Sequence, residues 1–239
     1  MVYNPTIASI TARGLFGRRR VLVLLPLPLL LVGLALLMRA NDVPARDWGQ
    51  PLLVGLGLAV LLPITALIVG TGVLGSEIDD GTVVHILTKP LSRAEILLSK
   101  YVVAVGVTVV TAAVPLFVAG YLASGVRLGL GLVAGAALGA LAYSALFLLL
   151  SLLTSRPVLL GLVYVLVWEG LLGTWVSGTR VFSVEQYVIT VTDRLAPTDL
   201  LTPNVSLTSS LIMAAIITAG AGVLAVNRLR SLSVAGETS

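Results

Sequence analysis

Long apolar stretches follow one another along this chain of 239 residues, with only short polar segments between them. Apolar runs of roughly 20 residues are long enough to cross a hydrocarbon core about 30 Å thick. The pattern therefore predicts an all-α membrane protein, one domain over residues 1–239, with six transmembrane helices. The predicted helices cover residues 21–37, 51–74, 101–123, 129–153, 157–175 and 207–226.

The composition agrees with this prediction. Apolar residues make up 57% of the chain and charged residues 11%, whereas soluble proteins carry about 25% charged residues. The chain has no cysteine, which excludes a disulfide framework and a thiolate metal site. The net charge is +4. Basic residues in a membrane protein first indicate its orientation, so this charge does not point to nucleic acid, and we expect no nucleic-acid partner. We expect a multi-pass protein of the plasma or inner membrane, in contact with the lipid bilayer.

Basic residues predict the orientation of these helices. With both termini in the cytoplasm, the inner segments carry more Lys and Arg than the outer ones, as the positive-inside rule requires. The inner residues are Arg13, Arg18, Arg19, Arg20, Lys89, Arg93, Lys100, Arg156, Arg228 and Arg230, and the outer ones are Arg39, Arg46, Arg127, Arg180 and Arg194. Trp48, Trp168 and Trp175 then fall near the outer interface, where amphipathic rings are favoured. Both signals predict cytoplasmic termini.

The residues before the first apolar run predict a short interfacial helix. Asn4 and Pro5 are typical of an N-cap followed by a proline at the first helical position. Ile7 and Ile10 then recur at helical spacing, so we expect an amphipathic helix on the inner membrane surface; a frayed segment is the alternative. The apolar run that follows is longer than that of a signal peptide and has no small-x-small site after it, which favours a retained membrane helix over a cleaved signal.

The segment Gly75–Lys100, GSEIDDGTVVHILTKPLSRAEILLSK, is a charged stretch between two apolar runs. Thr82 is suited to cap a short helix, which ends before Pro90 because proline disfavours helical geometry in the residue that precedes it. Ser92 and Glu95 then form a capping box that begins the next helix. We therefore expect a short helix between two firm turns. A solvated loop whose charges keep it out of the bilayer is the alternative.

The same segment contains the pattern Glu77-x-x-Asp80-Gly81-Thr82, followed by Ile86-Leu87-Thr88-Lys89-Pro90 and Ser92-Arg93-x-Glu95. This pattern resembles the loop between the first two hairpins of ABC-2 type transporter permeases, the membrane subunits of ATP-binding-cassette exporters. The resemblance implies that the segment is a coupling helix, which docks into a groove on a cytoplasmic ATPase subunit. The residues that would make or shape this contact are Glu77, Asp80, Gly81, Thr82, Ile86, Leu87 and Pro90. Arg93 and Lys100 would anchor the start of the next helix near the lipid headgroups.

The resemblance also implies a function. The chain would be the permease subunit of an ATP-driven transporter that exports an amphipathic drug, natural product, lipid or peptide. It would form a homo- or heterodimer with a second permease subunit and bind two copies of the ATPase subunit, which holds ATP and Mg. The chain has no phosphate-binding glycine loop with Lys-Ser/Thr and no G-x-S-x-G elbow, so we expect neither an enzyme nor a cofactor or metal bound by this chain.

Other functions stay open from the sequence. Within the family, the alternative is a permease for ion extrusion or metal-site maturation. Outside the transporting permeases, the alternatives are a secondary carrier and a membrane subunit for immunity or sensing that transports nothing. A carrier usually has several charged residues within its transmembrane helices or an inverted repeat.

Glu169 is the one acid inside a predicted transmembrane helix. At about 1.5 Å per residue, it lies about 18 Å from Pro157 along that helix, beyond the middle of the membrane. An acid at this depth is costly and is expected to face water or a partner group. We therefore predict that Glu169 faces the translocation pathway or the permease–permease interface. The alternative is a helix that ends early and leaves Glu169 among the outer headgroups.

Two further features concern helix packing. Gly131, Gly135 and Gly139 form a double G-x-x-x-G ladder, which permits close approach of another helix. This approach could occur within the subunit or between subunits. The outer segment 176–206 mixes apolar stretches with charges and prolines. ABC-2 permeases commonly have re-entrant outer helices at this place, so the resemblance implies a gate or lid here, and a solvated loop is the alternative.

Overall fold

The computed structural model of this chain describes residues 5–16, 20–79, 92–173 and 177–235. All regular elements in these ranges are helices. They are α1 (Pro5–Phe16), α2 (Arg20–Leu24), α3 (Pro26–Ala40), α4 (Ala45–Gly49), η1 (Gln50–Leu61), α5 (Leu62–Asp79), α7 (Arg93–Ser124), α8 (Val126–Leu153), α9 (Pro157–Val163), η2 (Tyr164–Leu172), η3 (Ser177–Phe182), α11 (Val184–Leu195) and α12 (Leu207–Ala235). The predicted all-α fold is confirmed.

Five helices in the described residues are long and apolar enough to cross a membrane. They are Leu22–Ala40, Ala45–Leu74, Arg93–Ser124, Val126–Leu153 and Leu207–Leu229. The predicted fifth crossing corresponds to a shorter apolar helix, Pro157–Leu172. At about 1.5 Å per residue the described part of this helix is about 24 Å long, less than the hydrocarbon thickness of about 30 Å. A multi-pass membrane protein is confirmed, whereas the count of six crossings stays a prediction.

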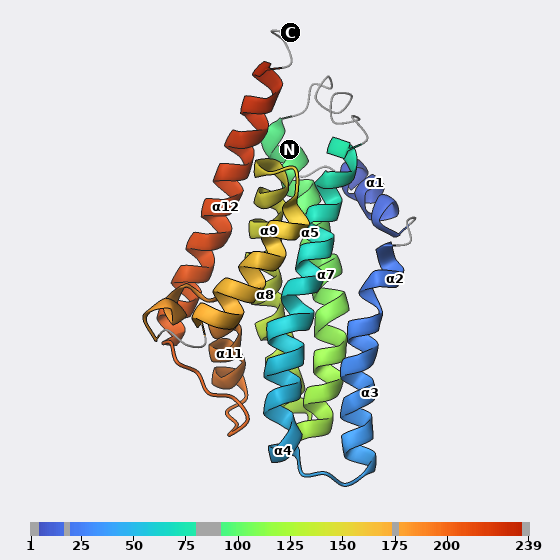
Figure 1. The fold of residues 1–239 in the computed structure, drawn as a ribbon, viewed down its shortest axis with the longest axis vertical. Coiled ribbons are helices and arrows are strands. Elements are labelled where there is room, and N and C mark those ends of the chain that lie inside the picture. Colours follow the sequence, from blue (N-terminus) through green and yellow to red (C-terminus); the bar gives the residue numbers. More distant parts are fainter. Residues whose placement is uncertain (1–4, 17–19, 80–91, 174–176, 236–239) are drawn as a thin grey trace.

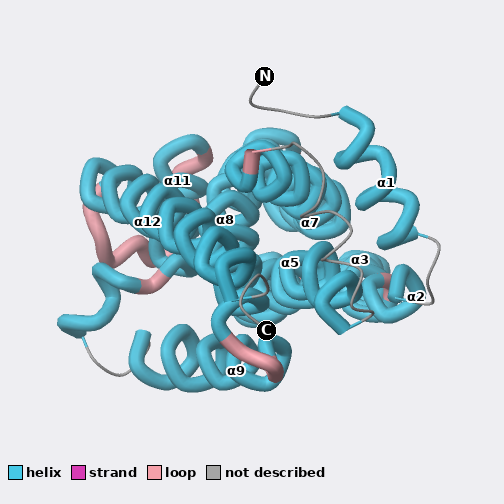
Figure 2. The backbone as a smooth tube through the Cα atoms, turned by 90° about the horizontal axis from the view of Figure 1, so that it is seen from above, coloured by secondary structure: helices cyan, strands magenta, loops and turns pink. Residues whose placement is uncertain are grey.

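The helices form one elongated bundle (Figure 1). α5, α7 and α8 pack against one another at its centre, α3 packs on α7, and α12 packs on α8. Figure 2, which views the bundle along its long axis, shows α9 at one side and α11 beside α8 and α12. α1 and the last turns of α12 lie at the same end of the bundle (Figure 1). We call this end the terminal end, and the opposite one, where α4 lies, the α4 end.

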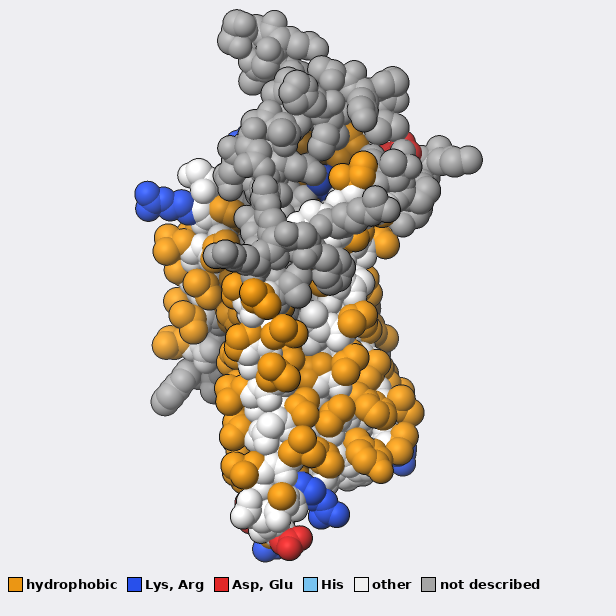
Figure 3. Space-filling view, turned by 90° about the vertical axis from the view of Figure 1, so that its right-hand side faces the viewer, with side chains coloured by type: hydrophobic (Ala, Val, Ile, Leu, Met, Phe, Trp, Pro, Cys, Tyr) orange, Lys and Arg blue, Asp and Glu red, His pale blue; other side chains and the backbone are white. Residues whose placement is uncertain are grey.

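The core is built from leucine and alanine where the central helices meet. Leu58, Leu61 and Leu116 are fully buried, as are many alanines whose small side chains let the backbones approach. In the most apolar stretch of each long helix, 61% of Ala45–Leu74 and 67% of Val126–Leu153 is buried inside the bundle. The corresponding share is only 17% for Leu22–Ala40 and 22% for Leu207–Leu229. Many large hydrophobic side chains are therefore exposed on the outside of the bundle, as the face drawn in Figure 3 shows. An apolar exterior of this kind is what a helix surrounded by lipid requires.

The predicted capping box at the start of α7 is present. The Ser92 side chain accepts a hydrogen bond from the Glu95 backbone N–H at 3.2 Å, and the helix begins at Arg93. The predicted N-terminal helix is also present as α1, which packs against α7 and α5. Its buried positions are Ala8 and Thr11, while Ile10 is exposed. These helix starts follow from local sequence signals.

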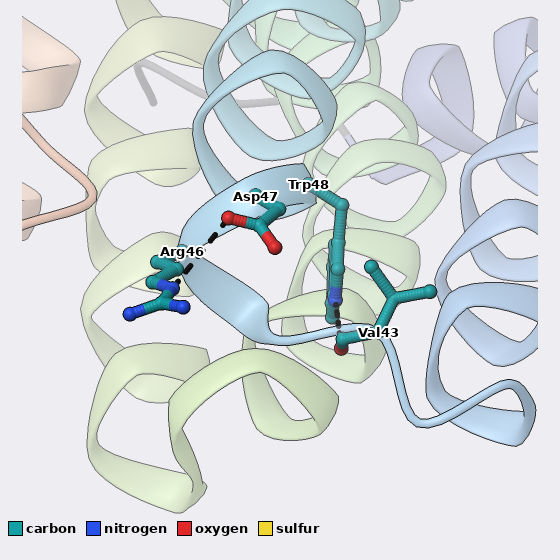
Figure 4. A network of polar contacts seen from close by, with 4 residues as sticks. All are labelled: Val43, Arg46, Asp47 and Trp48. Atoms are coloured by element: carbon teal, nitrogen blue, oxygen red, sulfur yellow. Dashed lines mark hydrogen bonds and ion pairs between the residues drawn. The ribbon is translucent and has the colours of Figure 1, made fainter.

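A compact turn joins α3 to the second crossing at the α4 end (Figure 4). The Trp48 indole Nε1–H donates to the Val43 carbonyl at 3.2 Å, and this side chain is buried against the core. Arg46 and Asp47 form an ion pair at 3.6 Å with both side chains exposed. Exposed ion pairs contribute little, roughly 0–1 kcal/mol, so the buried indole contributes more to this turn than the ion pair does.

Candidate functional site

The predicted coupling residues fall at the connection between α5 and α7. Asp80, Gly81, Thr82, Ile86, Leu87 and Pro90 lie outside the described residues. The backbone of Glu77 belongs to the last turns of α5, and its side chain is also outside the described part. Their roles stay predictions. The described structure fixes the two helices that enter and leave this connection.

A buried lysine joins these two helices. The Lys100 Nζ, on the second turn of α7, donates to the Val73 carbonyl of α5 at 2.8 Å. The side chain is 1% exposed. We expected Lys100 near the lipid headgroups, and this expectation is wrong, because its helix face turns toward α5 rather than toward the outside. A charge-assisted hydrogen bond is worth roughly 1.5–3 kcal/mol, so it ties the ends of α5 and α7 together beside the connection.

The second candidate residue, Glu169, lies in η2 and is 1% exposed. Its carboxylate accepts three hydrogen bonds. The Tyr164 hydroxyl donates to Oε1 at 3.1 Å, the Ser183 hydroxyl donates to Oε2 at 2.5 Å, and the Val184 backbone N–H donates to Oε1 at 3.0 Å. The acid is thus enclosed by groups of its own chain. These bonds offset the cost of burying a carboxylate away from water.

Two of these donors belong to the first residues of α11. Ser183 is the N-cap of that helix, and its side chain also accepts from the Gln186 N–H at 3.3 Å. A carboxylate at a helix N-terminus is favoured, because backbone N–H groups there lack partners within the helix and the helix dipole is positive. Glu169 therefore connects the end of the short apolar helix to the start of α11.

Sequence reasoning missed Ser183 and Tyr164 as partners of this acid. The start of α11 was detectable, because Ser183 and Gln186 have the spacing of a capping box. Tyr187 strengthens the same junction, since its hydroxyl donates to the carbonyl of Val181 in η3. No comparable local signal identifies Glu169 as the acceptor, because it lies on a different helix.

α11 packs against the glycine ladder of α8. A Cβ added at Gly131 would lie 3.1 Å from the Thr192 carbonyl, and one added at Gly135 would lie 2.9 Å from the Val188 carbonyl. At Gly139 the added atom would meet side chains of Val188 and Leu62. The ladder thus permits backbone-to-backbone contact within the subunit, and α11 lies against the first half of the long apolar helix α8.

A comparison with known protein families gives a match for most of the chain. The family model of the ABC-2 family transporter proteins matches residues 18–184. The chain belongs to the ABC-2 transporter family. A search of curated proteins finds no match. The ABC-2 match runs from before α2, through the connection between α5 and α7, to the first residue of α11.

Membership in the ABC-2 family carries functional information. ABC-2 permeases are membrane components of ABC transporters, which work with an ATPase subunit and are generally not catalytic themselves. The matched region contains the full α5–α7 connection and Glu169. It ends where α11 begins, so the contact between Glu169 and Ser183 lies within the match and most of α11 lies beyond it.

Proposed function

We propose that this ABC-2 protein is the permease subunit of an ATP-driven exporter for an amphipathic substrate. The family match over residues 18–184 carries this proposal. The chain would cross the cell membrane six times as one domain with cytoplasmic termini. It would pair with a second permease subunit and two ATPase subunits, and these ATPases would bind ATP and Mg. The terminal end of the bundle is then the cytoplasmic end.

The connection between α5 and α7 would receive force from the ATPase. Glu77, Asp80 and Thr82 belong to this connection or its edge, and the bond from Lys100 to the Val73 carbonyl lies between it and the membrane core. A push on the connection would therefore move α5 and α7 together rather than only bend the segment between them. This arrangement supports a role of the connection in coupling.

The outer part of the subunit would form the gate. Two observations support a re-entrant α11: it packs against Gly131 and Gly135 of the long apolar helix α8, and the preceding apolar helix is short. We propose that α9, η2 and α11 together occupy the depth of the membrane at this place. Glu169, which we predicted at the pathway or the permease–permease interface, would then act on the pathway by holding α11.

Removal of two acids at the connection tests the proposed function. We expect Glu77→Ala/Asp80→Ala to abolish co-purification of an ATP-hydrolysing partner from native membranes, because the proposed docking surface loses its charge. An ATPase assay of the purified material measures the loss. The control is Asp47→Ala/Asp199→Ala, which removes two exposed acids outside the connection. The proposal fails if wild type brings down no ATPase, or if both double variants retain it equally.

The buried lysine gives a second prediction. We expect Lys100→Met to leave the ATPase bound but to reduce substrate-stimulated ATP hydrolysis, because Met fills the space without donating to the Val73 carbonyl. The test compares substrate-stimulated with basal ATP hydrolysis in reconstituted vesicles. Arg156→Met is the control, since it removes an exposed basic residue at the same end of the bundle. If substrate stimulated ATP hydrolysis as strongly in the Lys100 variant as in the wild type, Lys100 would have no role in coupling.

A further inference from the structure

A second acid lies beside Glu169 at the start of α11. The Val184 backbone N–H donates to Glu169 Oε1 at 3.0 Å, and Glu185 is the next residue of the chain. Because Ser183 caps this helix, Glu185 belongs to its first turn. Glu169 is 1% exposed, and Glu185 is half-buried. Two carboxyl groups from different helices thus meet at one helix N-terminus, and both are at least partly removed from water.

The two acids differ in their hydrogen bonds. The Glu169 carboxylate accepts three, from two hydroxyls and one backbone N–H. An ionised carboxylate has about four acceptor sites, so these donors suit its charged form and leave one site open. Within the described residues, no hydrogen bond and no ion pair involves the Glu185 side chain. Glu169 is therefore the acid whose surroundings stabilise a negative charge, and Glu185 is the acid whose surroundings do not.

A buried tyrosine of α8 lies beside the two acids. The Tyr143 side chain is fully buried, and its hydroxyl has no hydrogen-bond partner of good geometry within the described residues. Glu169 and Glu185 are both close enough for their charges to act on this hydroxyl. A tyrosine hydroxyl can donate to a carboxylate or accept from a protonated carboxyl group. Tyr143 is therefore suited to either protonation state of the pair.

The other charged groups on the surrounding helices do not neutralise the two acids. Arg180 of η3 donates to the Asn204 side chain at 3.0 Å, and Arg127 of α8 donates to a carbonyl at the far end of α11. Tyr164 and Tyr187 are the remaining titratable groups that face the junction. Within the described residues, none of the charged side chains on the elements around the junction forms an ion pair with either acid. These charged residues are Arg127, Arg180, Asp193, Arg194, Arg228 and Arg230.

Two negative charges at this junction would repel each other. Burial and, after it, the charge of Glu169 raise the pKa of Glu185 to about 8. Because Glu185 is partly exposed, it can exchange a proton with water, whereas Glu169 is enclosed. Near neutral pH the pair therefore holds one negative charge and one proton.

We propose that Glu169 and Glu185 form a proton-binding site that keeps α11 attached to the bundle. A proton from water binds the Glu185 carboxylate and yields a neutral carboxyl group, while Glu169 keeps its charge and its three donors. Loss of this proton adds a second negative charge at the junction, and the repulsion loosens α11. Control of the outer gate by protons rests on the proposed function, whereas proton binding itself does not.

Infrared difference spectroscopy of the purified full chain detects such a proton, because the C=O band of a protonated carboxyl group is distinct from those of carboxylates and amides. Spectra are recorded in detergent between pH 6 and pH 10. We expect one such band to disappear with a midpoint near pH 8 in the wild type. The control Glu95→Gln, at an acid in the first turn of α7, should behave in the same way. The band should be missing in Glu185→Gln, and its midpoint should be lower in Glu169→Gln, which lacks the neighbouring charge.

The attachment of α11 gives a second readout. Thr192 of α11 is fully buried, so in the background Thr192→Cys a methanethiosulfonate reagent reacts only when α11 moves. The rate with Glu185 intact is divided by the rate in Glu185→Gln at each pH, which cancels the titration of the thiol itself. An acid whose pKa is raised in the attached state stabilises that state at low pH, and this stabilisation is lost as the pH rises through the raised pKa. We expect the ratio to rise by at most tenfold per pH unit, since one proton is lost, and to level off above about pH 8.

Each of the two readouts can overturn the proposal. It is wrong if no carboxyl band is lost between pH 6 and pH 10, or if Glu185→Gln keeps the titrating band. An unchanged midpoint in Glu169→Gln would show that the two acids do not act as a pair. A ratio of labelling rates that does not change with pH would show that the proton does not hold α11. Neither readout needs an ATPase or a substrate, so this inference and the proposed transport function can fail separately.

Discussion

Replacing Gly135 with leucine is expected to separate α11 from α8. A Cβ at this position would lie 2.3 Å from the Thr192 hydroxyl oxygen and 2.9 Å from the Val188 carbonyl oxygen. The hydroxyl can rotate away, but the carbonyl belongs to the backbone of α11, so the whole helix must move. Inserting atoms into a packed core usually costs roughly 1–3 kcal/mol, and a backbone clash places this variant near about 3 kcal/mol.

A cysteine reporter can measure this separation, because the chain has no cysteine of its own. Thr192 is fully buried between α11 and α8. In the background Thr192→Cys, a maleimide should react slowly with the otherwise unchanged protein and rapidly after Gly135→Leu. Gly106→Leu in α7 is the control, since a Cβ there meets nothing within 4 Å. Equal protection of the cysteine in both leucine variants would contradict the packing of α11 on the ladder.

The sequence predicts those features of this fold that depend on neighbouring residues. The apolar runs give the long helices to within several residues at each end, because the length of an apolar run is a local property. The start of α7 at Arg93 follows from the capping box of Ser92 and Glu95. The α1 helix follows from its proline and spacing. The family also follows, since the match over residues 18–184 agrees with the loop motif.

Features that depend on distant residues were not predictable in the same way. Lys100 was expected at the headgroups, but its position on α7 makes it face α5, and only the packing of the two helices decides this. The apolar run after Pro157 predicts a full crossing; the structure describes a shorter apolar helix there, Pro157–Leu172, so this crossing stays a prediction. A glycine ladder predicts that another helix approaches closely, but it does not identify that helix. The structure was therefore needed to show that the helix is α11.

Glu169 is a buried carboxylate that accepts three hydrogen bonds. Replacing it with leucine removes the acceptor for the Tyr164 hydroxyl, the Ser183 hydroxyl and the Val184 N–H. Each buried donor left without an acceptor costs roughly 1–3 kcal/mol. Partial relaxation will recover some of this cost, so we expect Glu169→Leu to destabilise the protein by about 3–5 kcal/mol. Thermal unfolding in detergent measures the change.

Two further variants separate the anchoring role of Glu169 from its charge. Glu169→Gln keeps the shape and one acceptor oxygen, but its amide NH₂ faces a donor, so we expect an intermediate loss of stability and of transport. Ser183→Ala combined with Glu169→Gln should lose less than the sum of the two single changes, because both interrupt the same bond. Glu185→Gln, at a half-buried acid in the first turn of α11, is the control. If Glu169→Gln retained full transport, full stability and an intact dimer, Glu169 would have no role in holding α11, in the pathway or at the permease interface.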